Sequence, residues 1–202
     1  MSVNCAKVMH LSLANKMLLK LKNDPSIIRF SALSCLEQCS ILVFTDVSFA
    51  NLPDKVSSAR GYLVFLVDSA SKCCLLSWGS NKVKRVVKST TAAECLALLD
   101  GLEDAFLLKS ILGEIFGMSN ERMRIIARTD HKNLYDAIHS SLPTTEKMLR
   151  IDIGIIKEML KSKKVESIER VENHEQFADL LTKKGVSNKC LLNMIQSGEL
   201  VR

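Results

Sequence analysis

The interpretation of this chain starts from ILVFTDVSFAN, residues 41–51. Apolar residues run directly into a carboxylate, Asp46, and small and polar residues follow it. A short apolar run rich in Ile, Val and Phe is typical of a buried β-strand. A carboxylate at the end of such a strand lies at the border of the core, where it costs free energy unless positive charge compensates it. We therefore expect other residues of the chain to form a common site with Asp46.

Further apolar segments predict a mixed α/β sheet with helices on its faces. The expected strands are 41–46, 61–67, 73–78, 123–129 and 165–171. The expected helices are 89–116, 131–140, 145–161, 176–184 and 191–195, with Ser89 as the N-cap of the first. The first three strands follow one another through short polar connections, which favours antiparallel pairing.

The segment before residue 41 differs from the rest. Residues 9–21 have a helical apolar pattern with lysines on the other faces, and 27–30 is a short extended candidate. We expect residues 1–40 to be an amphipathic appendage that packs on the following domain or on a larger protein. The predicted organisation is an appendage (1–40), a main domain (41–187) and a C-terminal helical tail (188–202).

Composition excludes several classes of protein. The chain has 202 residues, 47% of them apolar, a formal charge of +6 and a pI near 8.9, which permits a polyanionic partner without requiring one. No apolar run is long enough for a membrane span, and no signal peptide is evident. Seven cysteines without CxxC spacing favour reduced thiols over zinc. An aromatic content of 5% disfavours a stacking platform for single strands.

Three further carboxylates share the character of Asp46. Asp130 follows a predicted strand, Glu94 faces inward one turn into a long predicted helix, and Asp179 lies among apolar residues in FADLL. Such groups at one site repel each other, and their pKa values rise, unless divalent cations bind between them. Mg²⁺ prefers carboxylate oxygens, and a pair of such ions can promote phosphodiester hydrolysis. The four residues are therefore candidate metal ligands.

Each carboxylate also has a purely structural interpretation. Asp130 would be the N-cap of the helix after it, and Glu94 would favour the positive end of a helix dipole. Asp179 would pair with Lys183 at i,i+4. Asp46 is the hardest of the four to explain in this way, and the occurrence of all four together favours the metal site.

Five phrases occur in unbroken order over about residues 41–187: TDVSFAN, LSWGSNKVKRVVKSTTAAE, RTDHKNLYDAI, RIDIGIIKEML and NHEQFADLLTKKG. Together they resemble the ribonuclease H domain of Pol polyproteins from copia-type LTR retrotransposons. The phrases STxAAE and QxADxLTK are specific in combination and weaker alone. The acidic positions of the family carry over as Asp46, Glu94, Asp130 and Asp179, and all four are intact.

The resemblance implies an RNase H-like fold, with a five-stranded mixed sheet of order 3-2-1-4-5 and helices on both faces. It implies hydrolysis of the RNA strand of RNA–DNA hybrids during reverse transcription, with two Mg²⁺ ions for which Mn²⁺ can substitute. The implied partners are the hybrid and an adjoining reverse transcriptase. Residues 1–40 would be the tail of the connection segment of that reverse transcriptase. No membrane is implied as a partner. The implied location is the cytoplasm, in the virus-like particle of the element, or the nucleus; the protein is not expected to be secreted.

This chain departs from the family at two histidines. His131 follows Asp130, where many relatives carry Asn. His174 lies five residues before Asp179, in a shorter loop than the one that carries a mobile His in cellular ribonucleases H. An auxiliary role for His174 is therefore open.

Several polar residues are candidate nucleic-acid contacts. Four basic residues precede the Glu94 helix and would contact phosphates, although a solvated loop explains them equally well: Lys82, Lys84, Arg85 and Lys88. Four others would reach the minor groove, where the 2′-OH marks RNA: Ser48, Asn51, Thr91 and Asn133. Trp78 is expected in the core.

Two other functions remain to be weighed. A catalytically silent or domesticated RNase H-like module would bind nucleic acid or act as a scaffold. When such a domain is no longer selected for activity, its metal ligands are usually the first residues to be replaced. All four are intact here, which disfavours this alternative. A DDE integrase is disfavoured because that family has its Glu last, whereas the order here is Asp, Glu, Asp, Asp.

Overall fold

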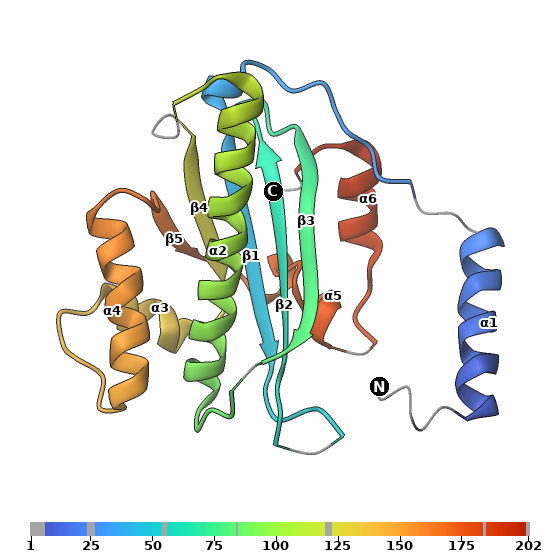
Figure 1. Cartoon of the computed structure of the whole chain (residues 1–202), viewed down its shortest axis with the longest axis horizontal. Coiled ribbons are helices and arrows are strands. Elements are labelled where there is room, and N and C mark those ends of the chain that lie inside the picture. The colour runs from blue at the N-terminus through green and yellow to red at the C-terminus, as the bar shows by residue number, and fades with distance from the viewer. Residues whose placement is uncertain are drawn as a thin grey trace.

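The computed structural model describes residues 7–23, 27–53, 56–83, 85–119, 123–183 and 185–200. Within them a five-stranded sheet has the order β3-β2-β1-β4-β5 (Figure 1). Its strands are β1 Ser40–Ser48, β2 Ala59–Val67, β3 Cys73–Lys82, β4 Arg124–Thr129 and β5 Ser167–Arg170. β1, β2 and β3 pair antiparallel, whereas β4 pairs parallel with β1 and β5 parallel with β4. The predicted mixed sheet and its strand order are confirmed.

β1 lies at the centre of the sheet and is covered on both faces. Alternate side chains of a strand point to opposite faces. Ile41 and Val43 pack into one apolar cluster, and Leu42 and Phe44 pack into another. Burial on both sides explains why this strand has a continuous apolar run rather than alternating polar and apolar residues.

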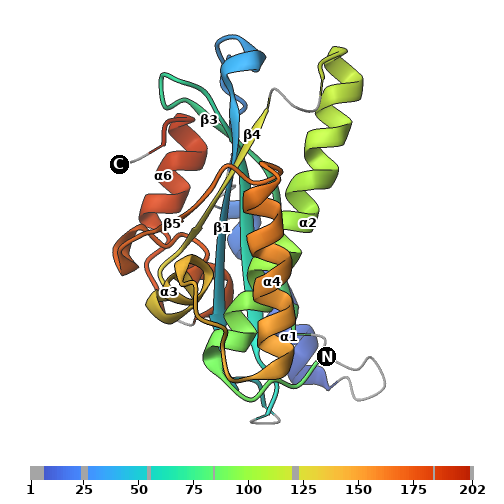
Figure 2. The same cartoon turned by 90° about the vertical axis from the view of Figure 1, so that its left-hand side faces the viewer.

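Helices form a layer on each face of the sheet. One layer contains α2 (Thr90–Phe116), α3 (Lys132–His139) and α4 (Lys147–Lys161), which share the first cluster with the sheet. The other contains α5 (Asp179–Thr182) and α6 (Lys189–Ser197), next to the second cluster. Figure 2 shows α6 on one side of the sheet and α2 and α4 on the other. None of the helices among the described residues has the length and apolar character needed to cross a membrane.

Ser89 begins α2 as expected. Its hydroxyl oxygen accepts a hydrogen bond from the Ala92 N–H at 3.2 Å, and Gly117 ends the helix in the left-handed conformation. Near the start of the sheet-facing stripe of α2, Glu94 is 4% exposed. The inward direction predicted for Glu94 is therefore observed.

Two local predictions are wrong. A continuous helix over 176–184 is not formed: after a short 3₁₀ turn, η3 (Asn173–Glu175), only the four residues of α5 are helical in the described part of this range. The Gln176 side chain donates to the Thr45 carbonyl oxygen at 3.0 Å and accepts from the Ala178 N–H at 3.3 Å, which holds a turn before α5. Trp78 is 54% exposed on β3 rather than buried.

The segments at both ends of the described chain differ in how they pack. α1 (Val8–Asn23) has no buried residue, and Figure 1 shows it apart from the sheet. The strap formed by residues 27–34 lies against α6, where the Arg29 N–H donates to the Ile195 carbonyl oxygen at 3.1 Å. A second 3₁₀ turn, η2 (Leu36–Gln38), leads into β1. Residues 198–200 lie along the start of β3, where the Cys73 N–H donates to the Gly198 carbonyl oxygen at 2.8 Å.

Candidate active site

Because β1 and β4 are parallel, Asp46 and Asp130 lie at the same end of the sheet, near the C-terminal ends of these two strands. In the β1–β4 register, Phe44 pairs with Arg128, and each carboxylate lies two residues beyond this pair. Asp46 is still within β1, whereas Asp130 directly follows the last residue of β4. β1 therefore continues two residues past the strand end predicted at Asp46, but the parallel register still brings the two carboxylates to the same end of the sheet, as expected.

A third carboxylate, Asp179, lies on α5, in the helix layer that also contains α6. It begins α5, which packs directly over β2 because Gly61 has no side chain there. A Cβ built on Gly61 would lie 2.6 Å from the Leu181 Cβ and 3.0 Å from the Thr182 Cγ2. Gly61 is also the β2 partner of Asp46 in the sheet. The glycine thus brings Asp179 close to Asp46.

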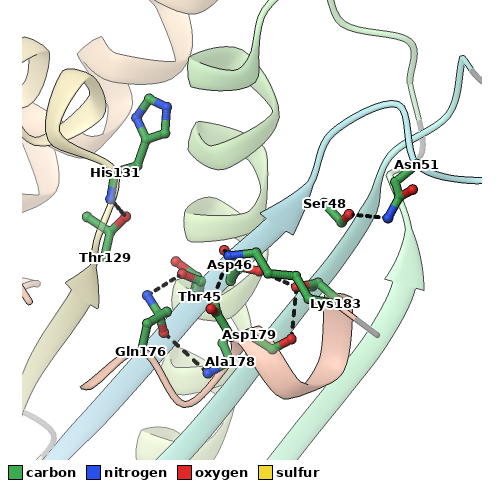
Figure 3. Close-up of polar contacts among 11 residues, drawn as sticks. Thr45, Asp46, Ser48, Asn51, Thr129, His131, Gln176, Ala178, Asp179 and Lys183 are labelled. Carbon is green, nitrogen blue, oxygen red and sulfur yellow. Dashed lines mark hydrogen bonds and ion pairs between the residues drawn. The ribbon is translucent and has the colours of Figure 1, made fainter. Parts of the chain in front are cut away.

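These three carboxylates form one cluster. Among the described residues, one oxygen each of Asp46, Asp130 and Asp179 lies within 4.8 Å of the others. Asp46 is 1% exposed, and the other two are half-buried. Figure 3 shows Asp46 and Asp179 facing each other from β1 and α5.

Glu94 lies beside the cluster rather than within it. Burial, followed by the charges of Asp46 and Asp130, raises the pKa of Glu94 to about 9. Its Oε2 atom is buried without a hydrogen-bond partner in the described structure. Close packing of α2 on β1 sets its position, since a Cβ on Gly101 would lie 2.8 Å from the Thr45 Cγ2.

Two residues of the phrase QxADxLTK contact the cluster: Thr182, which the sequence analysis did not name, and Lys183, which it considered only as a local partner of Asp179. The ammonium Nζ of Lys183 lies 3.2 Å from Asp46 Oδ1 and 2.7 Å from Asp179 Oδ1 (Figure 3). The Thr182 hydroxyl donates to Asp46 Oδ2. The i,i+4 pair of Asp179 and Lys183, considered above as a structural explanation, therefore exists inside the cluster itself.

The cluster carries more negative charge than Lys183 balances. Burial, Asp46 and Asp130 raise the pKa of Asp179, even though Lys183 acts in the opposite direction. Burial by itself lowers the pKa of Lys183, but Asp179 and Asp46 outweigh it and the pKa is raised. Clustered carboxylate oxygens and an unpartnered buried oxygen on Glu94 form a donor set that suits hard divalent cations. The residues present therefore fit the metal that the resemblance implies.

The two histidines noted in the sequence have different surroundings. His131, not Asp130, is the N-cap of α3: its Nδ1 accepts from the Leu134 N–H at 3.1 Å. The structural explanation for Asp130 as a helix cap is therefore wrong, and its carboxylate is not used for capping. His174 is exposed on η3 and is not a member of the carboxylate cluster.

The candidate minor-groove residues occupy the ends of elements around the cluster. The Asn51 side-chain amide donates to the Ser48 hydroxyl at 2.8 Å, so these two residues act as a pair after Asp46 (Figure 3). Thr91 is half-buried in the first turn of α2, and Asn133 is exposed at the start of α3. Their nucleic-acid contacts remain a prediction.

The basic residues before α2 divide into two kinds. Lys82 and Lys88 are exposed, while Lys84 lies outside the described residues. The Arg85 guanidinium forms an ion pair with Asp152, a buried carboxylate of α4. Arg85 therefore ties the loop to α4, and a phosphate would have to compete with Asp152 for it.

A cavity of about 790 Å³ lies elsewhere, between the C-terminal halves of α2 and α4. Phe106 and Met159 line it together with three lysines, Lys109, Lys163 and Lys164. The lining contains no carboxylate, so this cavity is separate from the candidate metal site.

Comparison with known sequences finds two retrovirus-related Pol polyproteins of Arabidopsis thaliana. The polyprotein of transposon RE1 is 28% identical and that of transposon RE2 is 26% identical, each over 144 residues or 71% of this chain. The chain spans about 9% of the length of each polyprotein. No protein-family model matches the sequence.

Comparison with solved structures finds ribonucleases H. LC11-RNase H1, isolated from compost by a metagenomic approach, superposes with a TM-score of 0.51 at 18% sequence identity. The match covers 75% of this chain and 98% of that enzyme. The fold is therefore the RNase H fold, and the sequence relatives are Pol polyproteins of copia-type transposons.

Proposed function

We propose that this chain is the ribonuclease H segment of a retrotransposon Pol polyprotein and that it hydrolyses the RNA strand of RNA–DNA hybrids. The observation that carries the proposal is the convergence of Asp46, Asp130 and Asp179 from three separate elements, with their oxygens within 4.8 Å of one another. A carboxylate cluster of this kind on the RNase H fold favours metal-dependent phosphodiester hydrolysis over nucleophilic catalysis by Ser or Cys.

In this proposal the carboxylates hold the metal and do not themselves attack the substrate. Asp46, Asp130 and Asp179 are the proposed ligands, and Glu94 is the fourth, with its unpartnered oxygen available. Two divalent ions, Mg²⁺ or Mn²⁺, would supply activation of a water and stabilisation of the leaving oxygen. The expected products carry a 5′-phosphate and a 3′-hydroxyl.

Recognition of the hybrid is proposed to rest on contacts around the cluster. Lys82 and Lys88 would contact phosphates, which position a duplex without reading its sequence. The Ser48–Asn51 pair would lie in the minor groove, where the RNA strand exposes its 2′-hydroxyls. An adjoining reverse transcriptase is the proposed partner of the exposed α1, and a cytoplasmic particle or the nucleus is the proposed location.

The test is cleavage of a labelled RNA–DNA hybrid by the wild type and by Asp46→Asn. We expect the substitution to abolish Mg²⁺-dependent cleavage, because it removes a negatively charged ligand, while circular dichroism and the unfolding temperature show a folded protein. Asp136→Asn, which removes an exposed carboxylate of α3, is the matched control and should cleave normally. Unreduced cleavage by Asp46→Asn would exclude the proposed mechanism.

A binding module without activity is the second candidate. It is favoured by one observation, namely that Lys183 already pairs with two of the carboxylates. Hybrid binding by the wild type without turnover in either Mg²⁺ or Mn²⁺ would support it. RNA duplex and DNA duplex controls in the same assay separate hybrid recognition from general affinity for polyanions.

A further inference from the structure

The side chain of Lys183 occupies the position between two proposed metal ligands. Its Nζ atom lies 2.7 Å from Asp179 Oδ1 and 3.2 Å from Asp46 Oδ1. These distances are those of charge-assisted hydrogen bonds. An oxygen that accepts a hydrogen bond from an ammonium at this distance cannot also face a metal ion in the same direction, because the two cations would repel each other.

The backbone holds Lys183 in this place, whereas its side chain is free to leave. The Lys183 N–H donates to the Asp179 carbonyl oxygen at 2.8 Å, so the residue ends α5 directly beside the cluster. Its side chain is 39% exposed, while that of Asp46 is 2% exposed. A flexible four-carbon stem with one side toward solvent can swing out, but the buried carboxylate cannot move away.

A neighbouring hydrogen bond completes the arrangement. The Thr182 hydroxyl donates to the second oxygen of Asp46, Oδ2. Two consecutive residues at the end of α5 therefore engage both oxygens of Asp46, one with a neutral donor and one with a cation. The Thr182 hydroxyl is neutral and does not compensate the charge of the Asp46 carboxylate. Among the described residues, the cation within hydrogen-bonding distance of Asp46 is Lys183.

We propose that Lys183 is a tethered cation that stabilises the metal-free cluster and is displaced when a divalent ion binds to Asp46 and Asp179. The inference rests on the proposed function, since it requires that these carboxylates bind metal. It adds a role for this residue: Lys183 competes with the metal, so it weakens metal binding and at the same time keeps the empty site folded. Removal of the ammonium should therefore change metal affinity and metal-free stability in opposite directions.

The experiment measures Mn²⁺ binding by calorimetry and unfolding temperature in chelator, for the wild type and Lys183→Met. We expect Lys183→Met to bind Mn²⁺ about tenfold more tightly, as loss of a hydrogen bond between charged groups implies. In chelator it should unfold at a lower temperature than the wild type, because the cluster then lacks its cation. Lys161→Met, in the exposed last turn of α4, removes the same charge away from the site. It should leave Mn²⁺ binding unchanged and lower the unfolding temperature only slightly, through loss of a cation at the C-terminal end of the helix dipole.

Lys183→Arg is the conservative variant, and it should keep metal-free stability and weak Mn²⁺ binding because it keeps the charge. Unchanged or weaker Mn²⁺ binding by Lys183→Met would overturn the inference while leaving the proposed function intact. Absence of Mn²⁺ binding in the wild type and in all variants would overturn both.

A measurement on the wild type keeps the test valid even if Lys183→Met does not fold. Nuclear magnetic resonance of the lysine side chains follows the Lys183 Nζ and Cε signals during a titration with Mg²⁺. Displacement predicts that the Nζ protons, protected in chelator, exchange rapidly with water at saturating Mg²⁺. Signals that stay protected at saturation would contradict displacement.

Discussion

At the scale of single residues, Glu94 shows the strongest electrostatic effect at the site. Its pKa is raised to about 9 by burial and by the neighbouring Asp46 and Asp130. At neutral pH the folded, metal-free protein therefore binds a proton on Glu94 that the unfolded chain, with a pKa near 4.5, does not bind. Folding of the empty site takes up this proton, and metal binding has to release it.

This proton uptake predicts how stability depends on pH. The contribution of Glu94 is fully present below about pH 4.5 and is lost as pH rises towards about 9, because the folded state binds more protons over this range. In chelator, the unfolding temperature of the wild type should fall more steeply from pH 5 to pH 9 than that of Glu94→Gln, whose amide does not titrate. Scanning calorimetry at several pH values measures both slopes. Parallel curves for the two proteins would show that Glu94 is ionised in the folded state.

The sequence predicted the acidic residues of the site better than their partners. Asp46, Glu94 and Asp130 could be identified because a carboxylate next to apolar residues is costly and therefore conspicuous. The pairing of Lys183 with Asp179 follows from their i,i+4 spacing and was considered from the sequence. The contacts of Lys183 and Thr182 with Asp46 could not be predicted, since only the fold brings these two residues to β1. The role of His131 as the N-cap of α3 could not be predicted either, because histidine is not a usual capping residue.

At the scale of elements, α5 is the part that the sequence described least well. Apolar spacing over 176–184 indicates a helix, but only Asp179–Thr182 is helical. The buried amide of Gln176 bonds to the backbone of β1 instead, and such a long-range contact has no local signal. The strands and longer helices, whose patterns extend over more residues, were predicted correctly because local pattern and packing agree there.

The close contact of α5 with β2 predicts that a methyl group added at Gly61 lowers both stability and activity. Gly61→Ala should lower the unfolding temperature, with a loss of about 1–3 kcal/mol from overpacking, because its Cβ would meet Leu181. It should also reduce hybrid cleavage, since α5 carries Asp179 and has to move away from Asp46. Gly154→Ala, on the exposed face of α4 with nothing within 4 Å, should instead stabilise the protein. Thermal unfolding and the cleavage assay measure both; equal stability of the two variants would contradict the packing argument.

At the scale of the whole molecule, α1 contributes nothing to the core. It has no buried residue, although it exposes eight large apolar side chains: Val8, Met9, Leu11, Leu13, Met17, Leu18, Leu19 and Leu21. The strap that follows does pack, since Leu33 contacts the core and the Ser34 N–H donates to Asp68 at 3.0 Å. In the described structure the strap therefore packs on the domain, whereas α1 does not.

Removal of residues 1–26 should thus leave the unfolding temperature of the remaining chain within about 2 °C of the full-length value, which corresponds to less than about 1 kcal/mol for a domain of this size. Removal of residues 1–39 is the contrasting variant and should lower it clearly, because the strap and Cys39 are lost from the core. Scanning calorimetry of the three proteins distinguishes them. A large destabilisation by the shorter deletion would show that α1 packs on the domain in solution.

The short segment 198–200 has a consequence for self-association. A strand at the edge of a sheet presents unpaired backbone groups to which a strand of another molecule can add, and this is a route to aggregation. β5 ends one side of this sheet with only four residues, whereas β3 on the other side has ten. Gly198 and Leu200 pair with Cys73 and Ser71, and Glu199 forms an antiparallel bridge with Lys72, so the start of β3 is shielded. Residues 198–200 follow all five strands in the chain, so during synthesis the sheet passes through a stage in which its longer edge is open to other chains.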